Sequence, residues 1–129
     1  MNNGSIYTHI QNNIATIEFF HPASNSFPSE LLQRLTKEFD VLSLNSEVKV
    51  IVLKSEKEGA FCAGASFDEL MSITNFEEGK QFFLGFANVI NAMRKCSKLI
   101  IGRVQGKVVG GGVGLAAACD YCLATEQAS

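Results

Sequence analysis

Two short stretches of small residues have the composition of sites that bind a ligand through the backbone. Ala63-Gly64-Ala65 follows one apolar stretch, and Gly110-Gly111-Gly112 follows Val108 and Val109. Small residues let backbone N–H groups approach a ligand closely, and glycine leaves φ unrestricted. A predicted helix follows each stretch, and the first N–H groups of a helix are unpaired and lie at the positive end of its dipole. Both turns are therefore predicted to bind an oxygen atom, unless their glycines serve only close packing of helix against strand.

The two turns have a joint interpretation if the strands before them are neighbours in one parallel sheet. Both turns then lie at the same sheet edge and face one crevice. One N–H from each turn can bind a single carbonyl oxygen, which is the geometry of an oxyanion hole, where loss of one donor costs about 3 kcal/mol of transition-state stabilisation. The predicted reaction builds negative charge on a thioester or a similar carbonyl.

Strands and helices are predicted to alternate along the chain, which indicates an α/β domain with a parallel sheet. The first half is expected to form a hairpin over residues 6–20 that turns at Asn12-Asn13, a helix over 28–42 with Pro28 in its first turn, and a buried strand over 48–53 covered on both faces. The second half is expected to form a helix after Ser66, a long helix over 76–95, a strand over 99–104, a helix starting in the glycine cluster and a strand over 120–124. Long connections between strands suit right-handed crossovers.

Two of these helices carry side chains near the predicted site. Ser66 suits an N-cap, and Asp68 and Glu69 then lie in the first turn, where we expect solvated carboxylates that stabilise the helix dipole. The long helix is expected to place its large apolar residues on one side, as core or as an acyl pocket: Phe82, Phe83, Phe86, Ile90 and Met93.

Composition limits the partners and the compartment. The 129 residues are 47% apolar and 19% charged, with a formal net charge of −2, as in a single globular domain. Nucleic acid and anionic membrane surfaces are not expected partners, because each requires a basic face. No apolar run is long enough to span a bilayer, and the first residues lack the pattern of a signal peptide, so a cytoplasmic location is expected.

The four cysteines are Cys62, Cys96, Cys119 and Cys122. Their small and apolar neighbours favour reduced thiols in a core over disulfides. Cys119 and Cys122 have CxxC spacing, but no second pair of ligands accompanies them, so no metal is expected.

The motifs, taken together and in order, resemble the enoyl-CoA hydratase/isomerase (crotonase) family. The resemblance depends on Asn25-Ser26-Phe27 before the first long helix, on residues 61–65 before a short acidic helix, and on Val104-Gln105-Gly106 leading to the glycine cluster and Ala118-Cys119-Asp120. It implies a crotonase-like ββα spiral, of which residues 1–129 form the first half, ending before a second catalytic acid.

The resemblance also implies roles for individual residues. The N–H groups of Ala63 and Gly111 would form the oxyanion hole for an acyl-CoA thioester and its enolate. Ala63, Gly64, Ala65 and Ser66 would line the path of coenzyme A, and Gly110 and Gly111 would also bind the substrate. No cofactor is implied apart from the coenzyme A of the substrate, and homotrimers or dimers of trimers are the implied assembly.

Two departures from the family pattern affect the predicted reaction. Hydratases of the family often carry Glu where this chain has Gly114, and Asp where it has Ser66. A second acid would lie past Ser129, so the 129 residues alone are expected to be inactive. Enoyl-CoA hydration is the first expectation and double-bond isomerisation the next, while a catalytically silent acyl-CoA-binding protein remains an alternative.

Two further classes of protein fit parts of the same motifs. Residues 112–117 match G-x-G-x-x-A, which a dinucleotide-binding fold carries, although the acidic ribose partner would lie beyond the C-terminal residue. Residues 64–68 place Ser66 in a small-residue turn, as in a serine hydrolase, but lack the closing glycine of a nucleophile elbow.

Overall fold

The strands of the chain form one mixed sheet. A computed structural model describes residues 3–56 and 58–129. Its five strands lie in the order of the sequence: β1 (Ser5–Gln11), β2 (Ile14–Phe20), β3 (Val50–Ser55), β4 (Leu99–Val104) and β5 (Tyr121–Ala124). β1 and β2 are antiparallel, and all later neighbours are parallel. Asn12 and Asn13 have φ values of 53° and 64°, which suits a two-residue hairpin turn and confirms the predicted hairpin.

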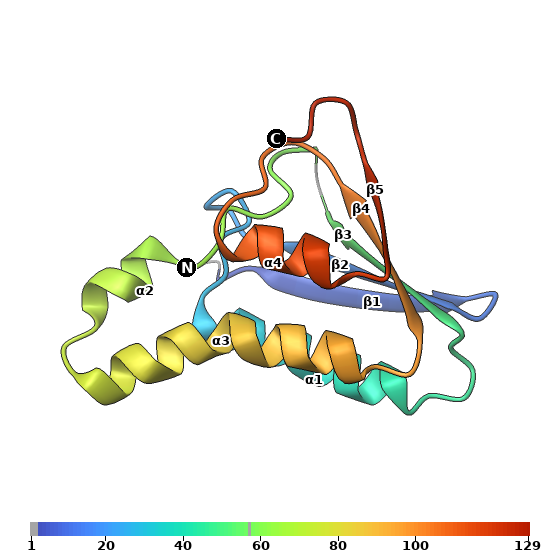
Figure 1. The fold of residues 1–129 in the computed structure, drawn as a ribbon, viewed down its shortest axis with the longest axis horizontal. Coiled ribbons are helices and arrows are strands. Elements are labelled where there is room, and N and C mark those ends of the chain that lie inside the picture. The colour runs from blue at the N-terminus through green and yellow to red at the C-terminus, as the bar shows by residue number, and fades with distance from the viewer. Residues whose placement is uncertain (1–2, 57) are drawn as a thin grey trace.

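The helices connect these strands and pack against one another. They are α1 (Ser29–Ser43), α2 (Phe67–Ser72), α3 (Phe76–Lys95) and α4 (Gly111–Ala118). α3 contacts both α1 and α4, whereas α2 extends away at one end (Figure 1). Asn75 accepts a hydrogen bond from the Glu78 N–H at 2.9 Å and caps α3, which has the predicted bounds. The mixed α/β architecture is thus as expected.

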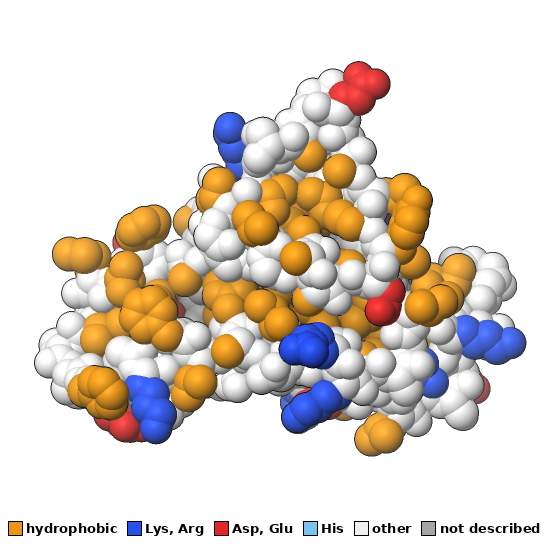
Figure 2. All heavy atoms as spheres, viewed as in Figure 1, with side chains coloured by type: hydrophobic (Ala, Val, Ile, Leu, Met, Phe, Trp, Pro, Cys, Tyr) orange, Lys and Arg blue, Asp and Glu red, His pale blue; other side chains and the backbone are white. Residues whose placement is uncertain are grey.

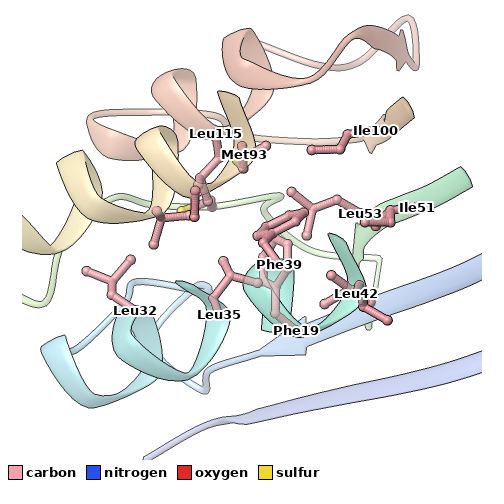
Figure 3. Close-up of a cluster of buried hydrophobic side chains, with 14 of the residues drawn as sticks. Phe19, Leu32, Leu35, Phe39, Leu42, Ile51, Leu53, Met93, Ile100 and Leu115 are labelled. Carbon is pink, nitrogen blue, oxygen red and sulfur yellow. The ribbon is translucent and has the colours of Figure 1, made fainter. Parts of the chain in front are cut away.

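The core lies between one face of the sheet and the helices. Alternate residues of β2, β3 and β4 are buried, as in a sheet covered on that face. α1 contributes Leu31, Leu32, Leu35, Phe39 and Leu42 at helical spacing. They form one cluster with side chains of the sheet, of α3 and of α4, and Figure 3 shows four of them, Leu32, Leu35, Phe39 and Leu42, together with Met93 and Leu115. Full burial of one such side chain stabilises the fold by roughly 1.5–3 kcal/mol.

Three details differ from the expectations. β3 has one buried face, because its outward residues Val50 and Val52 are only half-buried and the helices of the described residues pack on the other side. Pro28 is the N-cap of α1 and is not in its first turn, since its ψ of 158° is extended. Phe83 is 70% exposed, so it does not share the core side of α3 with Phe82.

The exposed apolar side chains are not evenly distributed. They gather over α2 and the first part of α3, and again around α4 and β5 (Figure 2). Among the residues that the structure describes, no helix has both the length and the apolar composition needed to cross a bilayer.

Two glycines of α3 provide a test of the α1–α3 packing. A Cβ at Gly85 would lie 2.8 Å from Cδ1 of the buried Leu32, whereas a Cβ at Gly79 would find its nearest neighbour 3.7 Å away. Replacing glycine by alanine inside a helix stabilises it by about 0.5–1 kcal/mol when there is room. We expect Gly79→Ala to raise the free energy of unfolding by about that amount and Gly85→Ala to lower it, as measured by denaturant titration. Equal stabilisation by both substitutions would contradict the close packing at Gly85.

Candidate active site

The two small-residue turns lie side by side beyond the ends of β3 and β4. Residues 63–65 are called the first turn below, and residues 110–112 the second turn. Cys62 and Val108 form an isolated parallel bridge, and the Val109 N–H donates to the Cys62 carbonyl at 3.1 Å. The Phe61 N–H donates to the Lys107 carbonyl at 2.9 Å. Because β3 and β4 are parallel neighbours, the predicted proximity of the two turns is confirmed. The segment before the glycines is not a regular strand, however, since β4 ends at Val104.

Glycine is required where these turns touch. Gly64 and Gly110 have φ values of 91° and 56°, in the region that side chains disfavour. A Cβ at Gly112 would lie within 2.4 Å of the Cys62 carbonyl oxygen, and a Cβ at Gly64 would lie 3.4 Å from the Gly111 nitrogen. The glycines therefore serve close packing, and this same packing brings the backbone of one turn against the backbone of the other.

Each turn presents a backbone donor that is not used inside the protein. In the part of the chain that the structure describes, neither the Ala63 N–H nor the Gly111 N–H donates a hydrogen bond. Gly111 is the first residue of α4, so its N–H lies at the positive end of that helix. An oxygen atom with partial negative charge is the kind of ligand that such donors stabilise.

The first turn is fixed to the loop before α1. The Phe27 N–H donates to the Gly64 carbonyl at 2.7 Å, and the Ser66 N–H donates to the Phe27 carbonyl at 3.0 Å. The Asn25 side chain accepts from the His21 N–H at 2.7 Å and donates to the Ala60 carbonyl at 2.8 Å. Asn25 thus connects the loop to the residues just before the turn.

The side chains after the first turn have structural contacts. Ser66 is buried, and its hydroxyl accepts from the Glu69 N–H at 3.3 Å, which confirms the predicted N-cap of α2. Glu69 is half-buried, and its carboxylate accepts from the Ser29 N–H at 2.7 Å at the start of α1. The predicted positions of Asp68 and Glu69 at the start of α2 are confirmed and Asp68 is exposed, but Glu69 is only partly solvated, because a helix that is distant in sequence supplies a donor for it.

Burial lowers the pKa of His21, although the negative charge of Asp68 nearby partly opposes this effect. The neutral imidazole accepts a hydrogen bond at Nδ1 from the Ala23 N–H at 3.1 Å. His21 therefore supports its own loop.

No carboxylate stands at position 114, and an apolar side chain occupies the space beside it. A Cβ at Gly114 would lie 2.9 Å from Cδ1 of Ile90 on α3. A longer side chain at 114 would require Ile90 to move. The second turn therefore presents backbone donors and small apolar residues.

The alternative motifs do not have the context that they require. Gly112 and Gly114 lie inside α4, whereas the first glycines of a dinucleotide fingerprint form the turn before the helix. The hydroxyl of Ser66 is buried and caps α2, so it is not displayed as a nucleophile.

The thiols nearest the turns are poor nucleophiles. Burial raises the pKa of Cys62 to about 12, and burial, Cys122 and Asp120 together raise the pKa of Cys119 to about 12. The Gly64 N–H donates to the Cys62 sulfur at 3.4 Å. Among the described residues, no group of three or more His, Cys, Asp or Glu side chains is arranged to hold a metal ion.

The site therefore belongs to an α/β domain in which two parallel strands lead into adjoining turns, each with a backbone donor that has no acceptor among residues 3–56 and 58–129. The model of the enoyl-CoA hydratase/isomerase family matches residues 9–129, and the chain belongs to this family.

Individual relatives agree with this assignment. Human mitochondrial methylglutaconyl-CoA hydratase is 35% identical over 104 residues, which cover 81% of this chain and 30% of that protein. A 6-oxocyclohex-1-ene-1-carbonyl-CoA hydrolase of Geobacter metallireducens is 28% identical over 107 residues, which cover 81% of this chain and 28% of that protein.

Solved structures share the fold. An enoyl-CoA hydratase from Mycobacterium smegmatis superposes with a TM-score of 0.89 at 26% identity, over 95% of this chain and 48% of that one. The chain thus spans about half the length of that solved relative, and about 30% of each of the two others. The fold of the matched half is that of the crotonase family.

The thiols give a test of the burial around the first turn. At pH 7.5 a pKa near 12 leaves a thiolate fraction on the order of 10⁻⁵ to 10⁻⁴, and only the thiolate is nucleophilic. We expect Cys122, which is exposed, to be alkylated first by iodoacetamide and Cys62 to remain protected. Peptide mass spectrometry at several times reads the order, and a urea-unfolded sample gives the unprotected rates. Early labelling of Cys62 would contradict the packing of the first turn.

Proposed function

We propose that the two turns form an oxyanion hole for the carbonyl oxygen of an acyl-CoA thioester. The donors are the N–H groups of Ala63 and Gly111. The observation that carries the proposal is that these two N–H groups donate to no group of the described residues, on turns whose backbones are in contact. Two fixed donors stabilise the enolate more than the ground-state carbonyl, because the charge on the oxygen increases in the transition state.

The coenzyme A moiety is proposed to run along residues 63–66, with Gly110 and Gly111 on the other side of the thioester. Gly64 is buried and the Ser66 hydroxyl is used as a cap, so these two residues shape the path more than they contact the substrate. The proposed chemistry needs no cofactor beyond the coenzyme A of the substrate. A trimeric assembly and a cytoplasmic location stay predictions.

Hydration of an enoyl-CoA is the reaction that we propose first. Hydration also requires a group that moves a proton, and position 114 does not supply one. Isomerisation is the second candidate, since it proceeds through the same enolate. The relatives named above carry out hydratase and hydrolase reactions by their names, which agrees with a shared oxygen-binding site and variable proton-transfer groups.

The contact between Gly114 and Ile90 also supports a silent acyl-CoA-binding protein. Position 114 carries no acid, and the terminal methyl group of Ile90 occupies the space beside it. Binding and turnover separate these possibilities. In the full-length protein we expect crotonyl-CoA to bind, as measured by calorimetry, and to be consumed, as measured by loss of its enoyl absorbance. Binding without consumption or isomerisation would favour the silent protein, and binding of NADH in place of crotonyl-CoA would overturn the proposal.

Gly111→Pro tests the donor directly. Proline lacks the N–H, and its ring suits the first position of a helix. Its Cβ would nevertheless lie 2.6 Å from carbons of the Phe86 ring. Gly111→Ala is the matched control, since it adds the same Cβ and keeps the N–H.

The expected result is a difference between the two variants. Gly111→Pro should have a kcat about 10²–10³ below that of Gly111→Ala, which is the effect of removing one oxyanion donor. Circular dichroism melts verify that both variants are folded. Equal activity of the two variants would remove Gly111 from the proposed oxyanion hole.

A further inference from the structure

The end of the Phe86 ring lies directly against Gly111. A Cβ at Gly111 would be 2.6 Å from Cε1, Cε2 and Cζ of Phe86, which is closer than any real Cβ contact. The ring therefore occupies the space where every other residue type at position 111 would place its side chain. Phe86 is half-buried and comes from α3, so this contact fixes the start of α4 against α3.

Phe27 connects the same ring to the other turn. Its fully buried ring packs edge-on to Phe86, with centroids 6.1 Å apart and an interplanar angle of 80°. Its backbone forms hydrogen bonds on both sides of Ala65, accepting from Ser66 at 3.0 Å and donating to Gly64 at 2.7 Å. Phe27 is held in turn by Phe19, at a centroid distance of 5.1 Å.

A continuous set of contacts thus runs from the first turn through Phe27 and Phe86 to the second turn. The direct contact between the turns is made of backbone and of glycines, which have no side chains to fix its geometry. Edge-to-face aromatic pairs are rigid and contribute about 0.5–1.5 kcal/mol beyond the burial of their area. The rigid groups that limit movement of Gly111 relative to Ala63 therefore include the two aromatic rings behind them.

We infer that Phe27 and Phe86 are positioning residues that set the separation of the Ala63 and Gly111 N–H groups. This inference rests on the proposed oxyanion hole. Neither side chain needs to touch the substrate, because each acts through the backbone of a turn. A smaller residue at 86 would let Gly111 move toward α3 and weaken one hydrogen bond to the thioester oxygen.

The test uses Phe86→Leu, with Phe83→Leu as the matched control. Both substitutions make the same change on α3, but Phe83 is 70% exposed and its ring pairs with that of Phe82. The probe is butyryl-CoA labelled with ¹³C at the thioester carbonyl. Its stretching frequency falls when the oxygen accepts hydrogen bonds, so infrared difference spectroscopy reports the geometry of the donors without any turnover.

We expect the carbonyl band to shift to lower frequency on the unsubstituted protein and on Phe83→Leu, and to recover part of that shift on Phe86→Leu. With crotonyl-CoA, kcat should fall on the order of tenfold for Phe86→Leu while KM changes little, because small misplacement of catalytic groups has effects of this size. Phe86→Tyr is a second variant. It keeps the ring and adds a hydroxyl at the end that faces Gly111, and it should also reduce the shift.

Three other results would contradict either the positioning role or the oxyanion hole. An equal band shift for the unsubstituted protein, Phe86→Leu and Phe86→Tyr would overturn the positioning role and leave the oxyanion hole standing. No band shift on the unsubstituted protein would overturn the oxyanion hole itself. A change in Phe83→Leu as large as in Phe86→Leu would show that general loosening of α3 accounts for the effect, which also overturns the inference.

Discussion

The structure around the candidate site depends on direct backbone contact between residues 61–66 and 107–112. The Gly112 Cα approaches the Cys62 carbonyl so closely that a Cβ would lie 2.4 Å from its oxygen, and the two segments also form an isolated parallel bridge. This contact continues the pairing of β3 and β4 past the ends of both strands. It fixes where α4 begins, and therefore which N–H groups of the second turn are left without an acceptor in the described part of the chain.

Such a contact makes the second turn sensitive to what lies behind it. α4 is only eight residues long and buries only Gly112 and Leu115 among its own residues. Its position is therefore set by its neighbours, which are the first turn on one side and α3 on the other. Phe86 and Ile90 of α3 adjoin the glycines at 111 and 114. Three glycines in one short helix thus have three different contacts, with the Cys62 backbone, with an aromatic ring and with an aliphatic side chain.

The elements could be predicted largely from local patterns. The apolar periodicity of α3 predicted a long helix with its observed bounds, and the two asparagines predicted the hairpin turn. The adjacency of the two turns followed from β3 and β4 being parallel neighbours. These predictions succeed because each depends on residues close together in sequence or on a general rule of sheet topology.

Apart from the position of Pro28, which is a local matter of one residue at the start of α1, the errors concern contacts that are distant in sequence. Glu69 accepts a hydrogen bond from Ser29, and no local pattern near Glu69 indicates that partner. Phe83 and Phe86 are both aromatic and three residues apart, yet only Phe86 meets α4. The partner of the Phe86 ring is a glycine, which carries no side-chain signal. Hydrophobic periodicity therefore identifies an apolar face but does not specify which part of that face another element covers.

These contacts support the proposal that backbone groups bind the thioester oxygen while other groups transfer the proton. Backbone donors need only a fixed main chain, so glycine and alanine can form them, and the side chains around them are free to differ between family members. Proton transfer needs a carboxylate or another titratable group at a defined position. In this chain position 114 carries glycine and the neighbouring space holds Ile90, so the proposed oxygen-binding site does not depend on a side chain at position 114. The two relatives that match most of this chain in sequence are a hydratase and a hydrolase by name, which is consistent with the same separation.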